Sequence, residues 1–242
     1  MHTLFQASGR VLRATLLFCG LSCAAMGAQT AATSLPDNYK TIFENSDVLV
    51  MHVHYGAHEF VPMHDHSAYP TVFVYLNDSG EVAIDHEAPK GFRVVRPPTH
   101  TGAFRIGPSM AERHSITNLS DIPSDFLRVE LKSIPLNDLK KDFRGHVPSP
   151  LLPGTRTEFE DPVLRIDRID CPSDTACSAT PTAARSLLVA ITPQQIQTTA
   201  GKRSLGLGEV VWLSANDDKA LHLSAGAQSL RITQAWSSQL LR

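Results

Sequence analysis

Three histidines have the residue type and spacing needed to bind a metal ion. His64 and His66 stand two apart in VPMHDHSAYP, shortly before a Val/Phe/Tyr run, and His114 lies in AERHSITNLSD. Side chains at positions i and i+2 of a strand share one face, so the first two imidazoles would point the same way. A third imidazole from a neighbouring strand would leave open positions for water or substrate. The alternative is a solvated strand end beside a hydrogen-bonded loop histidine.

The segments around these histidines have the pattern of an all-β protein. Short runs of Val, Ile, Leu and Phe, such as DVLVMHVHY, TVFVYLNDSG, EVAIDHE and FLRVELKSIP, alternate with clusters of Gly, Pro, Asn and Asp. This spacing predicts antiparallel strands in a sandwich or barrel. The residues NDSG at 77–80 predict a hairpin turn. The polar, proline-punctuated stretch 135–154 predicts a connector with room for one short helix.

The second half of the chain weakly repeats the first. DPVLRIDRID at 161–170 and RSLLVAIT at 185–192 match 46–55 and 70–77, each 115 residues earlier. LGEVVWL and SLRITQ match 101–107 and 126–131 in the same order. Four blocks in one order predict a duplicated β unit, with chance similarity among apolar strands as the alternative. We therefore expect a first domain at 38–134, a linker at 135–158 and a degenerate second domain at 159–242.

These residues resemble the two motifs of the cupin superfamily of small β-barrels. The first motif is matched by Gly56, His64, His66 and Gly80. The second is matched by Gly102, Pro108, His114 and Asn118. Thr71 stands where the family has a metal-binding glutamate, and Ala111 replaces a glycine. The resemblance implies two double-stranded β-helix (jelly-roll) barrels, a bicupin, with the metal site in the first.

The resemblance also implies a cofactor and a class of function. His64, His66 and His114 would hold one divalent transition metal, with Fe, Zn, Mn, Ni and Cu as candidates. Without the glutamate, the double positive charge of the ion favours an anionic small-molecule ligand. Three-histidine cupins include thiol and diketone dioxygenases, so a dioxygenase-like oxidoreductase is expected. A non-catalytic binding module and a purely structural barrel are the alternatives, because cupins host many chemistries.

Other residues are candidates for the lining of a ligand pocket. They are Tyr69, Thr71, Arg105, His52, His54 and Asn118. Several have plainer alternatives: the two histidines on a solvated rim, the tyrosine in the core and the arginine in a rim salt bridge. In the second half, Ala179 and Pro181 stand opposite the first-motif pair and Ala220 opposite His114. We therefore expect no metal in the second domain.

The first 28 residues have the order of a secretory signal peptide. Arg10 and Arg13 precede an apolar run at 14–23, and small residues suit cleavage near Ala28. The run is too short to span a membrane, so export to the periplasm or medium without a stable membrane span is expected. The alternative is an N-terminal helix. After cleavage, Cys171 and Cys177 are predicted to form a disulfide in an oxidising compartment, with two free thiols as the alternative.

Composition sets the broad limits. The chain has 242 residues, of which 42% are hydrophobic and 19% charged, as in an ordinary globular protein. A formal net charge of −2 gives no support for nucleic acid as a partner. The sequence is compatible with a homodimer.

Overall fold

The computed structural model describes residues 35–87, 91–107, 109–134, 143–182, 184–215 and 217–234. These residues belong to one compact unit. Apart from one 3-10 turn, η1 (Asp217–Ala220), the described elements are strands, which confirms the predicted all-β class. The described part of the chain contains no helix with the length and apolar character of a membrane span. The predicted signal peptide, Pro108 and the connector residues 135–142 lie outside the described residues.

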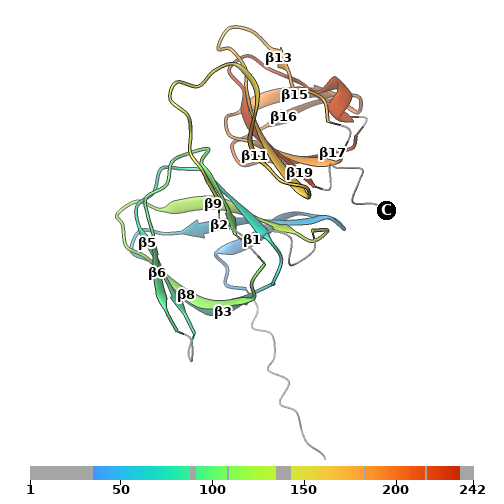
Figure 1. Ribbon diagram of the computed structural model, residues 1–242. Coiled ribbons are helices and arrows are strands. Elements are labelled where there is room, and N and C mark those ends of the chain that lie inside the picture. Colours follow the sequence, from blue (N-terminus) through green and yellow to red (C-terminus); the bar gives the residue numbers. More distant parts are fainter. Residues whose placement is uncertain are drawn as a thin grey trace, which may run out of the picture. The chain divides into compact units, whose positions relative to one another are not determined.

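The first half of the chain forms a barrel of two antiparallel sheets that face each other (Figure 1). The larger sheet has the order β1-β2-β9-β4-β7-β10, and the smaller one β3-β8-β5-β6. The strands of this first barrel are β1 (Tyr39–Glu44), β2 (Val48–Tyr55), β3 (Phe60–His66), β4 (Thr71–Tyr75), β5 (Val82–His86), β6 (Arg93–Arg96), β7 (Phe104–Gly107), β8 (Glu112–Asn118), β9 (Ser124–Leu131) and β10 (Phe143–Gly145).

The second half forms a second barrel with the same plan. Its sheets have the orders β11-β12-β19-β14-β17 and β13-β18-β15-β16. Adding ten to each strand number of the first barrel, β10 aside, gives the strand order of the second. The strands of this second barrel are β11 (Gly154–Glu160), β12 (Leu164–Asp170), β13 (Cys177–Ser178), β14 (Ser186–Ala190), β15 (Gln194–Thr198), β16 (Gly201–Leu205), β17 (Val210–Leu213), β18 (His222–Leu223) and β19 (Gln228–Gln234).

Alternation along the strands divides the apolar side chains between different cores. On β2, Met51 and Val53 belong to the core inside the first barrel. Val48 and Val50, on the opposite face, join a cluster that also holds Ile166 of β12. The period of two thus directs one face of β2 into the barrel, the side on which His64, His66 and His114 also lie.

Two predicted connections differ from the structure. The segment 77–80 is no hairpin, because β4 and β5 belong to different sheets and the chain crosses between them. Residue types that suit a hairpin also suit such a crossing, so composition alone could not separate the two. The predicted linker 135–158 contains β10, which pairs with β7, and most of β11, which pairs with β12. The second barrel therefore begins at Gly154.

The two cysteines that follow β12 are joined. Cys171 and Cys177 form a disulfide, with their Cα atoms 5.3 Å apart. The bridge closes the segment between β12 and β13, in the second barrel.

Candidate metal centre

Two neighbouring strands of the smaller sheet bring the three predicted histidines together. His64 and His66 lie on one face of β3, and His114 of β8 is the direct pairing partner of His64. A register shift between Val61 and His64 precedes the pair. All three side chains are buried, and one ligand nitrogen from each lies within 4.8 Å of the others. The predicted three-histidine cluster is therefore present in the folded chain.

The hydrogen bonds of these imidazoles fit a metal ion. The Nδ1 of His64 lies 2.7 Å from the carbonyl oxygen of Pro62. A carbonyl only accepts, so Nδ1 donates and the Nε2 of His64 keeps its lone pair for an ion. The Nδ1 atoms of His66 and His114 are buried and make no hydrogen bond to the described residues. The Nε2 of His64 lies 3.1 Å from the Nε2 of His66, so an ion bound at the first nitrogen would also lie beside the second.

The surroundings of the cluster keep its imidazoles neutral. Burial lowers the pKa of His64 and of His66 below the usual histidine value, and it lowers the pKa of His114 to about 3. The positive charge of Arg128 acts in the same direction on the pKa of all three rings. Neutral imidazole is the form that binds metal, so the ligands are ready at neutral pH and below it.

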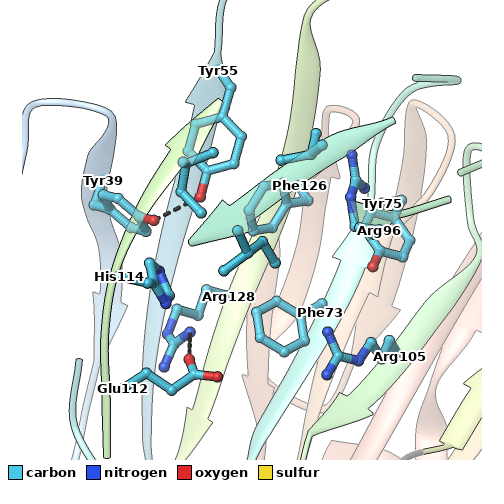
Figure 2. Close-up of a pocket in the computed structure, with 13 residues that line it drawn as sticks. Tyr39, Tyr55, Phe73, Tyr75, Arg96, Arg105, Glu112, His114, Phe126 and Arg128 are labelled. Atoms are coloured by element: carbon cyan, nitrogen blue, oxygen red, sulfur yellow. Dashed lines mark hydrogen bonds and ion pairs between the residues drawn. The ribbon is translucent and has the colours of Figure 1, made fainter. Parts of the chain in front are cut away.

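A cavity lies beside the cluster inside the first barrel. Its inner part, about 50 Å³, is lined by His114, Tyr39 and Tyr55, and its outer part, about 260 Å³, by Thr71, Tyr69 and His86 among others. The two parts share the lining residues Phe73, Ile84, Arg96, Arg105, Glu112 and Arg128. Figure 2 shows that the inner wall combines aromatic rings with these charged side chains. Through His114 the cluster borders the inner part, and the outer part has room for a small organic molecule.

Arg128 organises the charged side of the cavity. Its guanidinium is buried, with Nε 3.1 Å from Glu130 and Nη1 3.5 Å from Glu112 (Figure 2 shows the latter). Its Cζ lies 5.4 Å from the ring centroid of Phe73, and the Cζ of Arg105 lies 5.5 Å from the same centroid. The Phe73 ring thus contacts two guanidinium groups, an arrangement stabilised by attraction of cations to its π face.

The structure places three further candidates at the outer cavity. Thr71, Tyr69 and Arg105 line it. The Thr71 hydroxyl donates to the Tyr69 carbonyl at 3.1 Å, so the family's glutamate position carries a neutral, internally bonded group. A carboxylate enters instead from β8, because Glu112 precedes His114 by two residues and shares its face.

Three other candidates lie away from the cavity, which corrects the expectation that they line it. His52 and His54 are on the outer face of β2, where both approach Asp125, at 3.3 Å and 2.8 Å. The opposite face of that strand points into the barrel. The amide of Asn118 donates to the carbonyls of Gly56 and Ile122. Asn118 thus connects the segment that follows β2 to the segment that follows β8, and it does not line the cavity.

The sequence reading overlooked several residues that meet at the site. Tyr39 and Tyr55 lie with their hydroxyl oxygens 2.6 Å apart, and Tyr39 is 2.9 Å from the Nε2 of His64. Burial raises the pKa of Tyr39 well above its usual value and that of Tyr55 to about 12. Both hydroxyls therefore keep their protons at neutral pH. Arg128 could have been found by alternation, since it shares a strand face with Phe126; Tyr39 carries no such local signal.

The equivalent region of the second barrel is apolar. Ala179 donates its backbone N–H to the carbonyl of Leu221, and both side chains are buried in the second barrel's hydrophobic core. Leu221 therefore pairs with Ala179 as His114 pairs with His64. The counterpart of His114 is thus Leu221, one residue after the Ala220 that the sequence repeat indicated. Arg231 lies opposite the third residue of β14, as Arg128 lies opposite the third residue of β4.

No protein-family model matches the sequence, and no curated protein matches it. Among solved structures, the chain is similar to the bacterial pirin YhhW of Escherichia coli in complex with nickel(II), with a TM-score of 0.58, 13% identity, and 81% of this chain and 90% of that one covered. It is also similar to Ylba of E. coli (TM-score 0.57, 8% identity, 84% and 87% covered). A third is salicylate 1,2-dioxygenase of Pseudoaminobacter salicylatoxidans with gentisate (TM-score 0.51, 11% identity, 83% and 72% covered).

These structural neighbours are cupin-family proteins. At such low sequence identity the likeness concerns the fold. The predicted cupin fold is therefore confirmed, and its first barrel carries a buried three-histidine cluster.

Proposed function

We propose that this chain is an exported metalloprotein that binds one divalent transition metal through His64, His66 and His114 and transforms a small organic anion in a dioxygenase-like reaction. The observation that carries the proposal is the cluster itself, three buried neutral imidazoles that converge beside a cavity. When bound, the metal would supply a Lewis acid with positions open to ligand. The dioxygenase among the structural neighbours supports the reaction class.

The charges around the cavity support an anionic ligand. Four arginines line its two parts, namely Arg96, Arg105, Arg128 and Arg144, whereas Glu112 is the one carboxylate among the described lining residues. Arg96 donates to the hydroxyls of Ser79, Thr99 and Ser124, which leave its charge uncompensated. A doubly positive ion would add to this excess.

The size of the cavity supports a ligand of about one ring. A dry cavity of roughly 150 Å³ is enough to bind benzene. The outer part of the cavity measures about 260 Å³. Phe73 provides an aromatic surface there, and Arg105 stands over that ring to bind a carboxylate or phenolate. These residues would hold the ligand with its anionic group outward and its reacting atoms toward His114.

The alternative function is a non-catalytic module that captures metal or a small anion. The observation that favours it is the engagement of Glu112 by Arg128 at 3.5 Å. Glu112 is the one carboxylate among the described lining residues, and because it is already ion-paired, a binding role requires no proton transfer from it. Turnover measurements separate the two functions, because a binding module converts no substrate.

Export and duplication complete the proposal. The Cys171–Cys177 disulfide supports residence in the periplasm or outside the cell, where disulfides persist. The shared strand order supports an internal duplication in which the second barrel lost its ligands.

Metal stoichiometry and oxygen uptake test the proposal. The wild type, His64→Ala and His114→Ala should be purified without chelator and analysed for metal. His222→Ala is the matched control, since that histidine is exposed on β18 and bonds Ser178. One ion in the wild type and control, with severe loss in the other variants, is expected. Full occupancy in His64→Ala, or two ions per chain, would contradict the proposed site.

The reaction class needs a separate assay. Oxygen uptake by the loaded protein should be screened with small phenols, diketones, thiols and single-ring carboxylates. Metal-dependent uptake identifies the enzyme. Tight ligand binding without uptake identifies the binding module.

A further inference from the structure

Two buried tyrosines form a hydrogen-bonded chain that ends at a metal-ligand nitrogen. Tyr39 opens β1 and Tyr55 closes β2, and their hydroxyl oxygens lie 2.6 Å apart. The Tyr39 oxygen is also 2.9 Å from the Nε2 of His64. The Tyr39 ring centroid lies 5.0 Å from that of His64 and 4.9 Å from that of His66. Figure 2 shows both hydroxyls directed toward each other on the His114 side of the cavity.

The direction of this chain follows from His64. Its Nδ1 donates to the Pro62 carbonyl, so its Nε2 accepts the hydroxyl proton of Tyr39. The Tyr39 oxygen is then free to accept from Tyr55, which makes Tyr55 the first donor in the series. Tyr55 thereby fixes the rotation of the Tyr39 hydroxyl.

Metal binding changes the acceptor of Tyr39. An ion at the Nε2 of His64 takes the lone pair to which Tyr39 donates. A buried hydroxyl that loses its acceptor destabilises the protein, because its lost hydration is no longer offset by a hydrogen bond. The Tyr39 hydroxyl would therefore require another acceptor nearby. A ligand atom bound to the ion next to His64 would offer the Tyr39 hydroxyl such an acceptor.

We propose that Tyr39 is a positioning residue that donates a hydrogen bond to an oxygen-donor ligand at the open position of the metal, with Tyr55 holding its hydroxyl in place. The inference rests on the proposed metal site. It gives the tyrosine pair a role in ligand selectivity. Ligands that carry a lone pair next to the coordinated atom should bind more tightly than ligands that lack one.

Cobalt-loaded protein tests this choice without any turnover. The visible spectrum of bound Co²⁺ reports on ligands that enter its open position. Acetate and imidazole are the probes: coordinated acetate offers a lone pair to Tyr39, whereas coordinated imidazole presents only an N–H. The full chain should be titrated as wild type, Tyr39→Phe, Tyr55→Phe and Tyr75→Phe. Tyr75 lines the same cavity and makes a matched control.

The expected result is a selective loss of acetate binding. Tyr39→Phe should weaken acetate roughly five- to tenfold, the effect of one net hydrogen bond, with imidazole affinity and cobalt stoichiometry unchanged. Tyr55→Phe should cause a smaller loss of the same kind, and Tyr75→Phe none. If Tyr39→Phe does not fold, the ratio of acetate affinity to imidazole affinity in Tyr55→Phe tests the inference in its place.

Three results would overturn the inference. An unchanged ratio of acetate affinity to imidazole affinity in both Tyr39→Phe and Tyr55→Phe would show that the two hydroxyls play no part in ligand binding. A tyrosinate-to-metal charge-transfer band in Fe³⁺-loaded wild type, lost in Tyr39→Phe, would make Tyr39 a ligand instead of a donor. A wild type that takes up no Co²⁺ would overturn the proposed function as well, whereas the first two leave it standing.

Discussion

Replacing Asp167 by asparagine should destabilise the protein by about 3–5 kcal/mol, the usual cost of removing one partner of a buried ion pair. Asp167 lies inside the second barrel, fully buried, with its Oδ2 2.7 Å from the Nη2 of Arg231. Its Oδ1 accepts from Thr157 and Arg165 at 2.7 Å and 2.8 Å. Asparagine has nearly the same volume, so the substitution removes the charge and leaves the packing almost unchanged.

The cost comes mainly from Arg231, which has almost no access to water. Its side chain is 1% exposed, and its Nη1 donates to the carbonyl of Thr180 at 2.7 Å. A loss of this size is a large part of a typical total stability of about 5–15 kcal/mol.

Urea unfolding of the wild type, Asp167→Asn and the double variant Asp167→Leu/Arg231→Met measures the effect. The double variant should lie within about 2 kcal/mol of the wild type, because apolar replacement of a buried ion pair is often neutral. Metal stoichiometry should stay unchanged, since the proposed site is in the first barrel. A loss below about 1 kcal/mol in the single variant, or an equal loss in both, would refute this account of the pair.

Three further predictions concern the disulfide, the ligands and the N-terminus. Cys171→Ser should lower the free energy of unfolding by on the order of 2 kcal/mol, because the bridge closes a short loop, and an unchanged urea midpoint would contradict this. Metal occupancy, measured by equilibrium dialysis, should persist below the usual histidine pKa of about 6.5 and fall only at more acidic pH, because burial lowers the pKa of the ligand histidines. Loss already at pH 7 would argue against these ligands. The mature exported chain should begin at Ala28 or Gln29 by intact mass, and a retained Met1 would exclude cleavage.

Local patterns were sufficient for the fold class and for much of the metal cluster. The period of two in the apolar runs indicated strands, and it also placed His64 and His66 on one face. The cysteine spacing indicated a bridge between Cys171 and Cys177. The repeated blocks indicated two similar units, and their order agrees with the strand order of the two barrels. Each of these inferences depends on residues close in sequence or on a pattern carried by the backbone alone.

Barrel closure decided the remaining features. Tyr39 precedes His64 by 25 residues and meets it only because β1 and β3 belong to sheets that face each other. Leu221 is the counterpart of His114 by strand pairing, whereas the sequence repeat pointed to Ala220.

The clearest case is the pair of H-x-H patterns on adjacent strands in the sequence. His52 and His54 on β2 have the same spacing as His64 and His66 on β3, yet the first pair is outside the barrel and the second inside. Alternation places two residues on a common face, but it carries no information about which face becomes enclosed. That choice depends on the packing of the two sheets against each other, because burial of Met51 and Val53 inside the barrel turns the histidines of β2 outward.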